Sequence, residues 1–90
     1  MDFEIYIDNA IKGMKRLGYN PIYFIQMRKQ YGTIGAIKIL IHNPKPQGGF
    51  LKLHELGHPE LTMESIILEE QWKDLLTEED RKAAGNKLRT

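Results

Sequence analysis

The chain contains no cysteine, so neither a disulfide framework nor a thiolate metal site is available to it. No apolar run approaches the roughly 20 residues that span a bilayer, and the acidic start, with Asp2 and Glu4, does not resemble a signal peptide. Ninety residues with 41% hydrophobic content correspond to one small globular domain. We therefore expect a single domain over residues 1–90 that is cytoplasmic and has no membrane partner.

Acidic residues are missing from a long central stretch. Between Asp8 and Glu55 there is no aspartate or glutamate, although eight lysines and arginines fall there. Residues 55–80 show the reverse, with nine acidic residues and Lys73 as their one basic residue. Such blocks indicate either a dipolar molecule with one face suited to a polyanion, or two halves that neutralise each other on a mixed surface.

Alternating strand patterns are also scarce, and the apolar residues follow a helical period. They recur at three- and four-residue steps from residue 3 to 17, which predicts a first helix that Gly18 ends. Asn20 is expected to cap a second helix, with Pro21 at its first position and Gly32 at its end. Thr33 is expected to cap a third helix.

The segment 37–41 within that third helix has an alternative interpretation. Its β-branched residues would also suit a buried strand. We favour a helix, because no second alternating segment exists with which a strand could pair.

Breakers and caps divide the second half of the chain. Residues 43–49 form a loop dense in proline and glycine, and a short fourth helix over residues 50–56 ends at Gly57. Thr62 is expected to cap a fifth helix, and Thr77 with Asp80 resembles the capping box of a last one. The predicted fold class is all-α, a compact bundle of five or six short helices.

Residues 54–58, His-Glu-Leu-Gly-His, match the H-E-x-x-H pattern of zinc-dependent metalloproteases. On an unbroken helix His54 and His58 would bind zinc and Glu55 would act as general base. The third ligand would be a downstream glutamate, Glu78 or Glu79.

Three features argue against a zinc site. Gly57 and Pro59 are expected to end the helix before His58, no strand precedes it to orient a peptide, and its apolar residues face the core. The competing interpretation is a partly buried His54 and a His58 at a helix terminus. We predict no catalytic residue and no cofactor, with the alternative of a minimal zinc hydrolase that uses Glu55 and the metal ligands His54 and His58.

Several segments together resemble one bacterial family: residues 23–27, 32–40, 49–57, 60–65 and 76–80, with Ala83 and Leu88. Its members look like small helical proteins of unknown function, found alone or appended to restriction-type or HNH nucleases. The resemblance covers residues 19–88, so that residues 1–18 form a separate N-terminal helix. Members typically have tryptophan at the position of His54 and Arg-Leu at His58-Pro59. The resemblance thus implies that the histidine pair is not a family feature, and it transfers no catalytic residue.

The resemblance implies a non-catalytic helical interaction module, accessory to nucleic-acid or nuclease systems, whose partner is another protein. The alternative is a weak DNA- or RNA-binding domain in which the second and third helices form a helix-turn-helix-like hairpin. Arg28, Lys29 and Lys38 would then contact phosphates. Because the third helix is rich in Ile and Leu and poor in side chains that read bases, docking on a protein is the favoured hypothesis.

Overall fold

The structure is a computed structural model that describes residues 2–43 and 48–89. Those residues form five α-helices and two 3-10 turns and contain no strand, which confirms the all-α prediction. The helices are α1 (Phe3–Arg16), α2 (Ile22–His42), α3 (Gly48–Glu55), α4 (Met63–Ile67) and α5 (Glu78–Leu88), and the turns are η1 (Pro59–Leu61) and η2 (Glu70–Trp72). Within the described part, no helix is long and apolar enough to cross a membrane.

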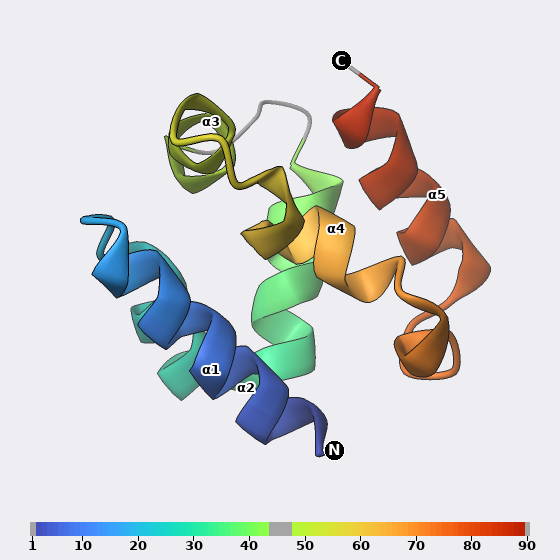
Figure 1. Cartoon of the computed structure of the whole chain (residues 1–90). Helices are drawn as coiled ribbons and strands as arrows, with labels where there is room; N and C mark the ends of the chain where they lie inside the picture. The colour runs from blue at the N-terminus through green and yellow to red at the C-terminus, as the bar shows by residue number, and fades with distance from the viewer. Residues whose placement is uncertain (1, 44–47, 90) are drawn as a thin grey trace.

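The second half of α2 runs through the middle of the molecule (Figure 1). It packs with α4 and α5, and α4 and α5 pack closely with each other. The first half of α2 lies beside α1, on the opposite side from α5, and α3 packs mainly against η1. The segment 37–41 is helical, as predicted, and lies at the centre of this arrangement.

Gly32 divides α2 into two halves, because its backbone angles, φ 79° and ψ 169°, are not helical. This confirms the predicted end of one helix at Gly32. The predicted cap by Thr33 is wrong, because its hydroxyl hydrogen-bonds to Arg28 and Glu4. The prediction for the start of α2 was wrong by one residue: Pro21 occupies the cap position with ψ 61°, and the side chain of Asn20 makes no cap. Asn20 instead uses its backbone carbonyl, which accepts a hydrogen bond from Ile22 N at 2.9 Å.

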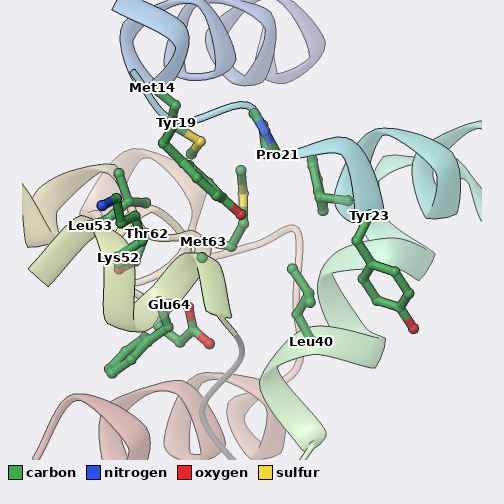
Figure 2. Close-up of a pocket in the computed structure, with 13 residues that line it drawn as sticks. Met14, Tyr19, Pro21, Tyr23, Leu40, Lys52, Leu53, Thr62, Met63 and Glu64 are labelled. Atoms are coloured by element: carbon green, nitrogen blue, oxygen red, sulfur yellow. The ribbon is translucent and has the colours of Figure 1, made fainter. Parts of the chain in front are cut away.

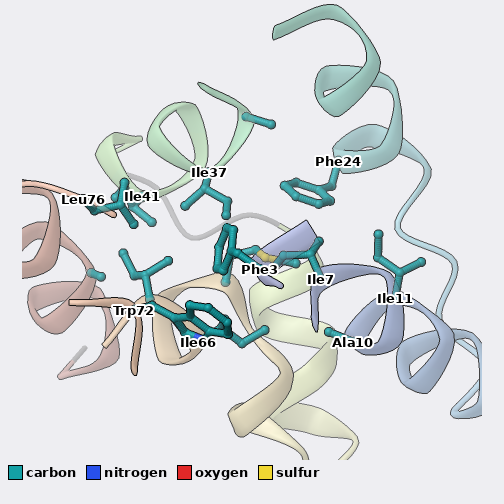
Figure 3. Packing of buried hydrophobic residues seen from close by; sticks show 14 of the residues in the cluster. Phe3, Ile7, Ala10, Ile11, Phe24, Ile37, Ile41, Ile66, Trp72 and Leu76 are labelled. Atoms are coloured by element: carbon teal, nitrogen blue, oxygen red, sulfur yellow. The ribbon is translucent and has the colours of Figure 1, made fainter. Parts of the chain in front are cut away.

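The core is built from the apolar faces of all these helices (Figure 3). Ile7 of α1, Ile37 of α2 and Ile67 of α4 are completely buried. The indole of Trp72 packs edge-on against two rings of α1, with centroid distances of 4.9 Å to Phe3 and 5.3 Å to Tyr6. A turn late in the chain is thereby fixed to the first helix.

Two helix starts follow the predicted capping chemistry. Thr62 Oγ1 accepts a hydrogen bond from Ser65 N at the start of α4. At α5, Thr77 and Asp80 form a complete capping box, in which each side chain accepts from the other residue's backbone N–H at 3.1 Å. Asp80 is also buried and bonds to α2, through His42 Nε2 at 2.6 Å. The cap of α5 is therefore also a tertiary contact.

Replacing Gly32 by alanine should lower the free energy of unfolding by about 2 kcal/mol, because φ near 80° with ψ near 170° is a region that essentially only glycine occupies. Gly85 is the matched control: it lies inside α5, and a methyl group there would have ordinary contact distance to the side chain of Arg89, 4.0 Å away. Gly85→Ala should stabilise by about 0.5–1 kcal/mol through helix propensity. Urea unfolding followed by circular dichroism measures both; equal effects would contradict the proposed backbone constraint.

Asp80 should make stability depend on pH in the acidic range. Burial alone would raise its pKa. The hydrogen bonds from His42 and Thr77 and the charge of Lys38 outweigh this effect and lower the pKa from 3.8 to about 2. Because the folded-state pKa is the lower one, the stabilisation is complete above pH 4 and is lost as the pH falls toward 2. Urea unfolding between these pH values should show a steeper loss for the wild type than for Asp80→Asn; identical slopes would refute this assignment.

Candidate binding pocket

The H-E-x-x-H segment is the end of α3 and not a continuous helical turn. The helix ends at Glu55, and Gly57 has φ 81°. Gly57 N donates to His54 O at 3.0 Å and His58 N donates to Leu53 O at 2.9 Å, the paired bonds of a glycine C-cap. His58, with φ −128° and ψ 57°, has therefore left the helix.

These geometries do not fit the zinc alternative. His54 Nδ1 donates to Phe50 O at 2.9 Å, and His58 Nδ1 bonds to Glu60 Oε2 at 3.0 Å. The proposed third ligands, Glu78 and Glu79, lie at the start of α5, on the other side of the molecule from α3 (Figure 1). No three His, Asp or Glu side chains of the described residues are grouped to hold a metal ion.

Of the three predicted phosphate-binding residues, Arg28 is held by acidic partners. Its guanidinium binds Asp8 at 2.6 Å and Glu4 at 2.8 Å on α1, and its Nε donates to Thr33 Oγ1 at 2.7 Å. The hydrogen bonds from Thr33 and Arg28 lower the pKa of Glu4, so the cluster keeps its charges. The hydroxyl of Thr33 is thus used in this cluster, beside the break at Gly32.

Lys38 and Lys29 lie in different surroundings. Lys38 forms an ion pair with Asp80 at 3.5 Å. Lys29 is exposed and takes part in no ion pair of the described residues. The second half of α2, which corresponds to the third helix of the predicted hairpin, buries Ile37 and Ile41 under other helices and is a core element. The structure does not bring the three residues together as one phosphate-binding surface.

A pocket of about 430 Å³ opens between α1, the first and last turns of α2, α3 and α4 (Figure 2). Its volume is within the range of about 300–1,000 Å³ typical of ligand sites. The apolar walls are formed by Met14, Phe24, Leu40, Phe50, Leu53 and Met63. Tyr19, Lys52, Thr62 and Glu64 contribute its polar groups.

Tyr19 is placed in the pocket by the end of α1. Its backbone N–H donates to Met14 O at 3.0 Å, a hydrogen bond typical of a glycine C-cap, and both side chains line the pocket. The phenol lies against Gly49, so closely that a β-carbon at this position would clash with the hydroxyl oxygen. Burial raises the pKa of Tyr19, so the phenol stays protonated at neutral pH.

A buried ion pair lies at the wall formed by α4. Glu64 Oε2 is 2.8 Å from Lys87 Nζ, and the two side chains are 5% and 9% exposed. Lys87 also donates to Leu40 O at 2.8 Å and has its ammonium 5.8 Å from the centre of the Phe50 ring. This pair therefore connects α5 to α4 and to the last turns of α2.

Comparison with protein-family models, with curated proteins and with solved structures found no match to this chain. The geometry itself must therefore carry the functional argument.

The sequence reasoning missed the residues that shape the pocket. The pairing of Glu64 with Lys87 was not predicted from the sequence. One signal was present: Glu64 stands among Met63, Ile66 and Ile67, so a carboxylate in this short apolar helix requires a cationic partner. The sequence does not say which of the lysines or arginines supplies it.

Lys87→Met should lower the free energy of unfolding by about 3 kcal/mol, because it leaves the Glu64 carboxylate buried without its cation. The double variant Glu64→Met/Lys87→Met should recover most of that loss, less about 1 kcal/mol for the hydrogen bond to Leu40 O. Urea unfolding of the single and double variants measures the coupling. Additive losses would show that the pair is not energetically coupled.

Proposed function

We propose that the chain is a non-catalytic binding domain that recognises another protein by enclosing an aromatic side chain of that partner in the pocket. The observation that carries the proposal is the open, largely apolar cavity between α2, α3 and α4. Aromatic side chains that fill such pockets dominate the binding energy of many protein interfaces.

The surface beside the pocket supports a protein partner. Tyr23 lines the pocket yet is 62% exposed, and its neighbour Ile22 is exposed as well. On α3, Leu51 is exposed between the pocket residues Phe50 and Lys52. Exposed apolar residues around a concave site are typical of interaction surfaces.

Charge favours a partner with an acidic residue near its anchor. Lys52 lines the pocket, is half-buried and forms no ion pair with the described residues. A carboxylate at the pocket edge would gain a favourable interaction with it, mainly in association rate and specificity. The resemblance to a family found beside restriction-type and HNH nucleases is the reason we expect the partner to belong to a nucleic-acid-processing system.

Selection of random displayed peptides on the wild-type protein should enrich sequences with one aromatic residue flanked by an acidic one. Binding of an enriched peptide should shift the methyl NMR signals of Met14 and Met63, which line the pocket. Met27 provides an internal control, since it is buried in the core outside the pocket lining. Failure to enrich any peptide that perturbs the two pocket methyl groups would contradict the proposal.

Two exposed tyrosines of α2 offer matched variants. Tyr23 borders the pocket, whereas Tyr31, which is 54% exposed, does not line it. Tyr23→Ala should weaken peptide binding about tenfold, and Tyr31→Ala should leave it unchanged. Equal effects of the two substitutions would show that the peptides bind elsewhere.

A further inference from the structure

The carboxylate of Glu64 has one oxygen engaged and one open. Oε2 is held by Lys87 Nζ at 2.8 Å, whereas Oε1 accepts no hydrogen bond from the described residues. Oε1 is not fully buried. Among the described residues, the fully buried side-chain nitrogen or oxygen atom that lacks a hydrogen-bond partner is Trp72 Nε1. Glu64 lines the pocket (Figure 2) and its side chain is 95% buried, so the pocket is the space from which a guest could approach this carboxylate.

The surroundings of this oxygen favour a ligand with a hydrogen-bond donor. A buried carboxylate oxygen in an apolar pocket gains more from a donor than an exposed one does, because no bulk water competes for it. A purely hydrocarbon guest would cover this oxygen without satisfying it.

The charge of the pair favours a neutral donor. Lys87 already compensates the charge of Glu64, so a second ammonium group would enter beside an existing one and lose its own hydration. A carboxylate guest would face the oxygen of Glu64 and be repelled. A neutral N–H or O–H on an apolar ring avoids both costs.

We propose that the pocket is specific for a donor-bearing aromatic side chain, tryptophan in particular, whose indole N–H donates to Glu64 Oε1. This deepens the proposed function and rests on it. The indole fills apolar space while presenting one donor and no acceptor, which matches the single open acceptor of Glu64.

Three capped amino acids test the inference by methyl NMR: N-acetyl-tryptophanamide, its 1-methyl-indole analogue, and N-acetyl-phenylalaninamide. The first should shift Met14 and Met63, leave Met27 unmoved, and bind about tenfold more tightly than the methylated analogue, which lacks the donor. The phenylalanine compound should bind as weakly as the methylated one.

Variants connect this preference to Glu64. Glu64→Gln keeps an acceptor oxygen and should retain part of the preference, whereas Glu64→Met/Lys87→Met should abolish it while both indoles still bind. Thermal unfolding checks that each variant is folded. Equal binding of the two indoles to the wild type, or an undiminished preference in the double variant, would overturn the inference. If either of these results is accompanied by shifts at Met14 and Met63, the proposed aromatic-binding function still holds and only the tryptophan preference is wrong. If no compound shifts these methyl signals, both proposals are refuted.

Discussion

The ammonium group of Lys87 is the contact on which the arrangement of three helices depends. From α5 it reaches the Glu64 carboxylate on α4 and the Leu40 carbonyl at the end of α2. Dehydrating two charges costs several kcal/mol each, so such a pair contributes little net stability, while its contacts constrain how the three helices pack. It also brings the aromatic ring of Phe50 close to α5.

The pocket follows from this arrangement. α4 starts at Thr62, whose hydroxyl caps the first turn, so Met63 and Glu64 project from a fixed helix start into the pocket. The opposite wall is also positioned by a helix end, because the hydrogen bond that closes α1 places Tyr19 over Gly49 of α3. Hydrogen bonds at helix ends thus position Tyr19 and Glu64 within apolar walls, which is the preorganisation that specific binding requires.

Local signals were predictable and long-range ones were not. The caps at Thr62 and Thr77 and the breaks at Gly32 and Gly57 depend on residues within one turn, and the structure confirms them. The predicted cap at Asn20 was one residue too early, because Pro21 lies outside the helix. The stretch without acidic residues suggested basic side chains available to a polyanion. Arg28 nevertheless forms ion pairs with Glu4 and Asp8, which lie outside that stretch. Ion pairs between residues 20 or more positions apart, and the pocket itself, depend on how the helices pack. The spacing of apolar residues in the sequence does not determine that packing.

The break at Gly32 also determines how a chain of this length encloses a core. A straight helix of 21 residues would measure about 32 Å, as long as the whole molecule, whose extents are 32, 29 and 24 Å. Such a rod would leave most of its sides facing water. Divided at Gly32, the same residues serve two separate layers, one beside α1 and one packed against α4 and α5. One glycine thereby lets a single helix bury Phe24 and Met27 before the break and Ile37 and Ile41 after it, each pair in its own layer.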